Sequence, residues 1–251
     1  VMKKNLYGII AILMILFSVN TLAQKNFEPG YVVENSGDTL RGYIDNREWI
    51  TNPKRITFRE TADGQNKAFS PMNISMFHVQ GTNYHSAVVE ARTNTDNLQN
   101  LTYDSELRTL TDTIFLKALA MGKADLFFLR DDELINHFYI RMNDGDFQEL
   151  IYYPYLVEHE GVPVLQHNKR YIGQLIYLFD DCPDLKGQIN NVDYKTKALT
   201  KLFNRYNQCA GSFQDISYNK TGGKFGISHR LPPVYRLQNI VFPDTGGHIS
   251  Q

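Results

Sequence analysis

The residues best suited to chemistry in this 251-residue chain are two cysteines and seven histidines. Cys182 and Cys209 are too far apart for a C-x-x-C motif, so nothing indicates redox catalysis. An even number of cysteines in an exported protein is usually oxidised and paired. We therefore expect a structural disulfide between them, and two free buried thiols are the alternative.

The histidines do not show the spacing of a metal site. Neither H-E-x-x-H nor H-x-H occurs, and no histidine clusters with a cysteine. His159, Glu160 and His167 form the one neighbourhood of histidine and acid, and we interpret it as a solvated loop. The G-x-S-x-G elbow and the P-loop are also missing from the sequence. We predict no catalytic residue, no metal ligand and no cofactor.

A hydrolase is a lesser alternative, with a site assembled from residues distant in sequence. His137, Asp144 and Glu149 supply an imidazole and two carboxylates, which are the groups that general acid–base catalysis uses. Nothing else in the sequence singles out this trio. The acidic run at 131–133 is expected at a hairpin tip, and a calcium site there would lack EF-hand spacing.

Aromatic residues allow a second alternative, a secreted glycan-binding module. Exposed Trp49 and the tyrosines Tyr152, Tyr153 and Tyr155 could stack on sugar rings. The ordinary interpretation is that these aromatics form the core of a β-sheet and its rim.

The chain begins with a segment typical of export. Lys3 and Lys4 precede an apolar run at 6–17, and small residues follow it. We predict a signal peptide over 1–23, with cleavage before Gln24. A retained anchor is the alternative, but a membrane span needs about 20 apolar residues. No cysteine follows the run, so a lipid anchor on the mature N-terminus is not expected, and the predicted location is the periplasm or outer membrane.

Composition excludes some classes of protein. The sequence has 26 basic and 27 acidic residues, and losing Lys3 and Lys4 gives 24 − 27 = −3. A nucleic-acid partner is not expected, because it would need a basic face. The 42% hydrophobic content is enough for a sizeable core rather than a disordered chain.

Residues 24–160 are predicted to form a β-rich domain. The turn triplet at 36–38 lies between two extended runs, which is a hairpin signal. Asn-Asp-Gly-Asp at 143–146 predicts a reversal into a strand at 147–153. The polar stretch at 91–112 is interpreted as a long loop with room for a short helix. Hairpins without intervening helices favour an antiparallel sheet or a small sandwich.

The pattern becomes helical over 164–210. A helix at 169–180 and another at about 193–207 carry apolar residues at helical spacing, and a short helix lies between them. Asp181 and Asp193 are expected to cap the second and third helices. The apolar faces consist of Ile172, Leu175, Ile176 and Phe179 in the first helix, and of Leu199, Leu202, Phe203 and Tyr206 in the third.

Topology gives an independent reason to pair the cysteines. Three short helices joined by tight turns should run up, down and up. The junction of the first two, at Cys182, would then lie at the same end as Cys209, just past the third. The predicted fold class is α+β, an antiparallel β-rich N-terminal domain followed by a small disulfide-linked three-helix segment. Residues 211–251 lose this pattern and are interpreted as an irregular tail or the start of a truncated barrel.

Several stretches between Phe27 and Cys209 form a recognisable set: PGY (29–31), GDTLRG (37–42), NPKRI (52–56), DTIFL (112–116), KRYIGQL (169–175), DCP (181–183) and LFNRYNQC (202–209). The set resembles a bacterial family of exported proteins whose complete members end in an outer-membrane β-barrel. The resemblance implies a β-rich periplasmic domain, a cysteine-bearing helical connector and then the barrel, and it supplies no catalytic residues.

The chain departs from this plan after the connector. A barrel needs at least 8 strands of about 10 residues, and only 251 − 209 = 42 residues follow Cys209. We expect either a chain truncated before its barrel or a relative without one. The function expected is a non-enzymatic envelope protein with a binding or structural role. Its partner would be an envelope protein or outer-membrane component, and a glycan is the alternative ligand.

Overall fold

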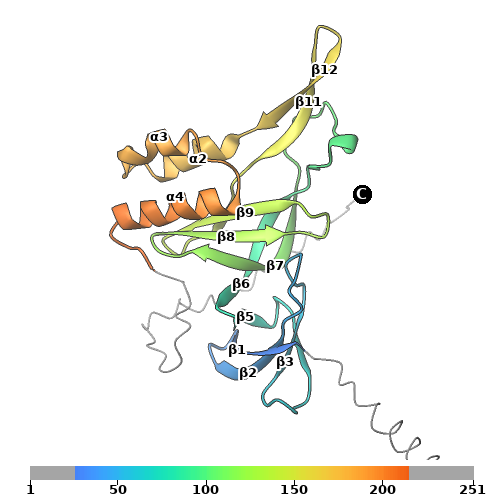
Figure 1. Cartoon of the computed structure of the whole chain (residues 1–251), viewed down its shortest axis with the longest axis vertical. Coiled ribbons are helices and arrows are strands. Elements are labelled where there is room, and N and C mark those ends of the chain that lie inside the picture. The colour runs from blue at the N-terminus through green and yellow to red at the C-terminus, as the bar shows by residue number, and fades with distance from the viewer. Residues whose placement is uncertain (1–25, 215–251) are drawn as a thin grey trace, which may run out of the picture.

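Antiparallel pairing organises most of the chain. The computed structural model describes residues 26–214, so the predicted signal peptide and nearly all of the 211–251 tail lie outside the described residues. Ten strands form one sheet in the order β10-β9-β8-β7-β6-β5-β1-β2-β3-β4 (Figure 1). These strands are β1 (Phe27–Glu34), β2 (Thr39–Asp45), β3 (Ile56–Arg59), β4 (Lys67–Phe69), β5 (Ile74–Val79), β6 (Thr82–Arg92), β7 (Thr109–Ala120), β8 (Ala124–Arg130), β9 (Asn136–Met142) and β10 (Phe147–Glu149).

The predicted turns lie where strands reverse. Gly37 has a φ of +95° between β1 and β2, a backbone conformation that glycine adopts without a steric cost. Asn143 and Asp144, with φ of 50° and 59°, reverse the chain between β9 and β10. The acidic run at 131–133 forms the connection between β8 and β9. The expected hairpins are therefore present.

The predicted strand at 147–153 is wrong in its second half. β10 ends at Glu149. The Leu150 N–H still donates to the Phe138 carbonyl of β9 at 2.8 Å, but beyond it other groups satisfy the backbone. The Leu150 carbonyl accepts a hydrogen bond from the Tyr194 hydroxyl at 2.6 Å, and the Ile151 N–H donates to the Gln174 side chain at 2.9 Å. These bonds tie the departing chain to the helical region.

The loop between β6 and β7 agrees with its prediction. It contains a single 3₁₀ turn, η1 (Leu98–Asn100), and both flanking strands extend a little into the predicted loop. The two remaining strands, β11 (Tyr153–His159) and β12 (Val162–Asn168), form a separate two-stranded sheet. The boundary predicted between 160 and 164 therefore falls at the turn of this hairpin, and strand structure continues to Asn168.

A β-bulge decides which residues of β7 reach the helices. Ala118 pairs with Phe127, and both belong to an apolar cluster on one face of the sheet. The register then shifts, so that Ala120 pairs with Leu126 and both belong to a cluster on the helix-covered face. A bulge inserts one unpaired residue and so reverses the alternation of faces.

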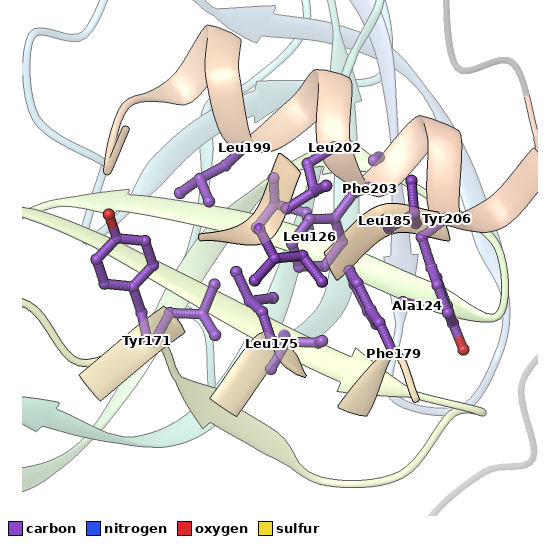
Figure 2. Packing of buried hydrophobic residues seen from close by; sticks show 14 of the residues in the cluster. Ala124, Leu126, Tyr171, Leu175, Phe179, Leu185, Leu199, Leu202, Phe203 and Tyr206 are labelled. Carbon is purple, nitrogen blue, oxygen red and sulfur yellow. The ribbon is translucent and has the colours of Figure 1, made fainter. Parts of the chain in front are cut away.

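Helices cover that face of the sheet at β7 to β9 (Figure 1). The segment contains α2 (Arg170–Leu178), the 3₁₀ turn η2 (Pro183–Leu185), α3 (Lys186–Ile189) and α4 (Thr196–Cys209). Figure 2 shows side chains of α2 and α4 meeting Ala124 and Leu126 of β8. The helical segment and this part of the sheet share one hydrophobic core. Truncating Phe203, which is fully buried there, would cost about 3–5 kcal/mol.

The two predicted helix caps are wrong. α4 begins at Thr196, and no side chain caps its start. Asp193 instead forms an ion pair with Lys195 at 3.3 Å. The short helical turn after Asp181 is likewise uncapped by a side chain, because the Asp181 carboxylate is used in a tertiary contact with Lys123.

No helix within residues 26–214 combines the length and the apolar character needed to cross a membrane.

Candidate functional site

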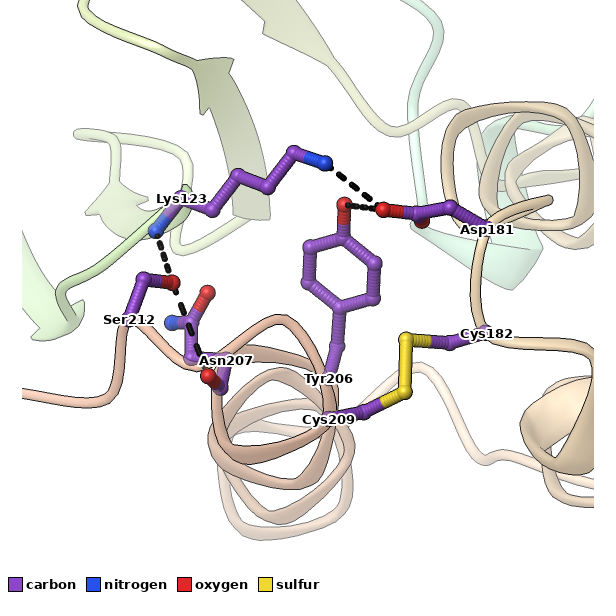
Figure 3. Close-up of a disulfide and its surroundings, with 7 residues drawn as sticks. All are labelled: Lys123, Asp181, Cys182, Tyr206, Asn207, Cys209 and Ser212. Atoms are coloured by element: carbon purple, nitrogen blue, oxygen red, sulfur yellow. Dashed lines mark hydrogen bonds and ion pairs between the residues drawn. A yellow bond between two sulfur atoms is a disulfide. The ribbon is translucent and has the colours of Figure 1, made fainter.

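The end of α4 is joined covalently to the start of η2. Cys182 and Cys209 form a disulfide with a Cα–Cα distance of 6.4 Å (Figure 3), and the predicted pairing is confirmed. Cys182 is buried and Cys209 is exposed. The bridge therefore closes a covalent loop that contains η2, α3 and α4.

A buried amide joins the same helix end to the turn between β7 and β8. The Asn207 Oδ1 accepts a hydrogen bond from the Ala124 N–H at 2.9 Å. Its Nδ2 donates to the carbonyls of Ala124 at 2.9 Å and Met121 at 3.2 Å. Asn207 is 0% exposed, and its amide supplies hydrogen-bond partners for backbone groups of the β7–β8 turn.

Gly122 makes this approach possible. A Cβ at this position would lie 2.5 Å from the Asn207 Cγ and 2.7 Å from the Ser212 carbonyl oxygen. Neither neighbour can move freely, because one is a fully bonded buried side chain and the other is backbone. A glycine is therefore required where the turn meets α4.

The chain leaving α4 is bound to the same turn. The Ser212 N–H donates to the Asn207 carbonyl at 2.8 Å, and the Ser212 hydroxyl accepts from the Lys123 N–H at 2.8 Å. Two residues later, Gln214 pairs with Met121 in an isolated antiparallel bridge. The direction in which the chain leaves the helical segment is thus set by the sheet.

An ion pair borders the disulfide (Figure 3). Lys123 Nζ lies 2.6 Å from the Asp181 carboxylate, which also accepts a bond from the Tyr206 hydroxyl at 3.4 Å. The hydrogen bond from Lys123 lowers the pKa of Asp181, and the same bond raises the pKa of Lys123. Both groups are partly exposed, so solvent screening keeps the contribution of this pair to stability small. We name the disulfide, Asn207, Gly122, Ser212 and this ion pair the exit junction.

A second polar cluster lies inside the sheet. His137 Nδ1 is 2.7 Å from Glu149, and His137 Nε2 is 3.1 Å from Asp131. Glu149 also accepts the Arg92 backbone N–H at 2.7 Å. A neutral imidazole has one N–H, whereas this arrangement asks both nitrogens to donate to carboxylates. Burial disfavours the charged imidazole, but its hydrogen bonds to the Asp131 and Glu149 carboxylates outweigh this effect and raise the pKa of His137.

The hydrolase trio is only partly assembled. His137 and Glu149 meet, whereas Asp144 lies in the turn between β9 and β10, 3.5 Å from Arg141. The side chains of His137 and Glu149 are 1% and 3% exposed. A general base must reach the proton that it removes, and this pair is enclosed in the core, where it holds β9 and β10 to the end of β6. Sequence reasoning did not identify the roles of Arg92 and Asp131 in this cluster.

Trp49 lines a cleft, whereas the three tyrosines considered with it are used in packing. The cleft has a volume of about 330 Å³, and polar residues around it include Arg47, Asn52 and Lys54. The Trp49 ring packs edge-on against the rings of Phe77 and Tyr84. The other aromatics are used in the fold: Tyr153 is buried, Tyr152 stacks on Tyr194 and His167, and Tyr155 packs beside Tyr153.

Asn52 fixes the loop that carries this tryptophan. Its Nδ2 donates to the carbonyls of Phe115 and Phe128, both at 2.9 Å, and its Oδ1 accepts from the Arg130 N–H at 3.0 Å. The cleft wall is therefore held against β7 and β8. Residues 26–214 contain no cluster of three or more histidine, cysteine or acidic side chains arranged to hold a metal. His159 and His167 lie at opposite ends of the β11–β12 hairpin.

Comparison of the chain with protein-family models, with curated proteins and with solved structures gives no match.

Proposed function

We propose that this chain is a non-enzymatic exported protein of the bacterial envelope, periplasmic or associated with the outer membrane. In this proposal residues 164–210 act as one disulfide-linked three-helix connector. The sheet and connector together hold the segment that follows, or an envelope partner, in a defined orientation. The observation that carries the proposal is the exit junction, where a disulfide joins the end of α4 to the start of η2 and several polar contacts bind the departing chain to the β7–β8 turn.

Two further features support the proposal. Disulfides persist in oxidising compartments such as the periplasm and are rare in the cytosol, and the chain begins with a segment typical of export. The most reactive-looking cluster, around His137, is enclosed and uses its polar atoms to join strands. This arrangement is typical of a structural role rather than of a reaction centre.

The direct test is the mass and membrane partition of the native protein in its own cells. We expect a product that has lost residues 1–23 and fractionates with the periplasm or the outer membrane. A product much larger than the mature chain in the outer membrane would indicate a connector to a further domain. A product of the mature mass in the periplasm would indicate that the connector serves a partner. Recovery from the cytoplasm with the leader retained would contradict the proposal.

Glycan binding is a second candidate, favoured by the position of Trp49. It is the only tryptophan in the chain, and it lines a cleft of about 330 Å³ beside cationic and amide side chains. Intrinsic tryptophan fluorescence therefore reports on this cleft alone. Titration with envelope polysaccharides should shift the emission if the cleft binds sugar. If polysaccharide leaves the Trp49 emission unchanged, both in the native chain and in the Arg47→Ala variant, glycan binding at this cleft is ruled out.

A further inference from the structure

The β11–β12 hairpin extends beyond the rest of the described chain (Figure 1). Its two strands are joined by Glu160 and Gly161, with φ of 52° and 77°, which is the geometry of a tight two-residue hairpin turn. A two-stranded ribbon is only marginally stable in water without a further strand or packing against another element. This hairpin packs at its base, where Tyr153 is buried, and its outer part is exposed.

The two edges of the ribbon are not equivalent. The Leu156 N–H donates to the Thr102 carbonyl at 2.9 Å, so on β11 this residue points its backbone groups away from β12. Leu156 is directly opposite Leu165. In an antiparallel ladder both members of such a non-hydrogen-bonded pair turn their N–H and C=O outward. Leu165 therefore presents these groups along the free edge of β12.

The alternation of the ladder extends this edge in both directions. Pro163 and His167 are two residues from Leu165, so their backbone groups also point outward. Pro163 lacks an N–H, and its outward position means that no bond to β11 is lost. Within residues 26–214 no group bonds to the outward N–H or C=O groups of these three residues. The free edge thus offers two donors and three acceptors.

The free edge also lacks the usual protection. Natural edge strands are commonly blocked by charged residues, especially lysine, or by proline. β12 has the sequence VPVLQHN, with no lysine, arginine, aspartate or glutamate. Val162 and Leu165 are 59% and 41% exposed. Pro163 is its one blocking residue, and it removes a donor at one end only.

We propose that β12 pairs antiparallel with β12 of a second copy of this chain, centred on Leu165. Each Leu165 N–H then donates to the Leu165 carbonyl of the other copy, and each His167 N–H donates to the Pro163 carbonyl of the other copy. All four outward donors of the pair are satisfied, and the two His167 carbonyls, each opposite a Pro163 without an N–H, accept no bond across the pair. Such an arrangement has the two-fold symmetry of an isologous dimer.

The edge fits a second copy for two reasons. Its donors and acceptors complement one another under a two-fold rotation, so an identical strand satisfies every outward N–H, and only the His167 carbonyl opposite Pro163 lacks a donor. The side chains agree with this pairing, because Leu156 and Leu165 share one face and would form a continuous apolar row across four strands. No like charges oppose each other within the paired strands. Since only two strands meet, we expect association in the micromolar to millimolar range.

The first test compares two substitutions at one position by sedimentation equilibrium of the full chain over micromolar to millimolar concentration. Leu165→Pro removes the outward N–H while leaving the ladder to β11 intact, as Pro163 already does. Leu165→Ala shortens the side chain and keeps the N–H. We expect dimers for the native chain and for Leu165→Ala, and at least tenfold weaker association for Leu165→Pro, with unchanged circular dichroism in all three. A native chain that stays monomeric, or a Leu165→Pro chain that dimerises equally well, would overturn the proposal.

The second test detects the register. Residues in a hydrogen-bonded antiparallel pair have Cα atoms about 5.5 Å apart, within the range that a disulfide spans. Leu165→Cys should therefore form a covalent dimer on mild oxidation, visible on a non-reducing gel. Tyr177→Cys is the matched control, because Tyr177 is 79% exposed on α2, away from the edge. Equal cross-linking of the two variants would contradict pairing at Leu165.

Discussion

Removing the Asn207 side chain should loosen the helical segment from the sheet. Asn207→Ala deletes three hydrogen bonds to the β7–β8 turn, each worth about 1 kcal/mol net. It also leaves buried backbone groups of Ala124 without those partners, at an added cost of about 1–3 kcal/mol when no water replaces them. Alanine recovers about 0.6 kcal/mol of helix propensity. We expect a loss of about 3–5 kcal/mol in the free energy of unfolding.

The assay is urea unfolding under oxidising conditions, with Asn204→Ala as the matched control. Asn204 lies three residues earlier on α4, is partly exposed, and makes no side-chain hydrogen bond to the described residues. The same change of residue type should there raise stability by about 0.6 kcal/mol through helix propensity alone. If the two variants unfold within about 1 kcal/mol of each other, the amide does not hold the turn and the reasoning about the exit junction is refuted.

Three further predictions concern the same core. Replacing Cys182 and Cys209 by serine opens a loop with a sequence separation of 27, so the unfolded chain gains conformational entropy. Denaturant titration should show a free energy of unfolding that is lower by about 3–4 kcal/mol. A loss of less than about 1 kcal/mol would contradict this entropic argument. Gly122→Ala should destabilise the chain, because the added Cβ clashes with the buried Asn207 amide. Gly173→Ala has nothing within 4 Å of its added Cβ and should stabilise α2 by about 0.5–1 kcal/mol. Melting temperatures that shift in the same direction in the two variants would contradict this prediction. The raised pKa of His137 predicts a contribution to stability that is fully present below the unfolded-state pKa of about 6.5 and is lost as pH rises through the folded-state pKa. Denaturant titrations from pH 6 upward should show this decline in the free energy of unfolding of the native chain and no such decline in His137→Gln. Identical pH profiles for the two chains would contradict the prediction.

Local patterns predicted the parts of the fold that depend on neighbouring residues. The hairpin turn at 143–146 and the apolar spacing of α4 are of this kind. The disulfide was also predictable, because short helices with tight connections leave few arrangements for Cys182 and Cys209. Covalent and periodic constraints are visible in sequence since they act over short distances or through one residue type.

The failures arise where tertiary contacts compete with local preference. Asp181 and Asp193 have the right chemistry for helix caps, but lysines bind both carboxylates instead. Asn207 looks like an ordinary helix residue, and its importance depends on a turn 83 residues earlier in the chain.

The His137 cluster shows the same limit. Glu149 reaches the imidazole because the register of β9 and β10 places it opposite Tyr139. The Arg92 N–H joins the cluster from 57 residues away, through the curl of the sheet that brings β10 towards the end of β6. Single-sequence reasoning named two of these residues as part of a hydrolase and could not see that the fold would enclose them.

The oxidation state of the cysteines in living cells tests the proposed envelope location most directly. Whole cells would be quenched with acid, free thiols alkylated, and the envelope and cytoplasmic fractions analysed by non-reducing mass spectrometry. The account predicts a peptide linking Cys182 to Cys209 in the periplasmic or outer-membrane fraction, on a chain that has lost residues 1–23. Two alkylated thiols on a chain recovered from the cytoplasm would contradict it.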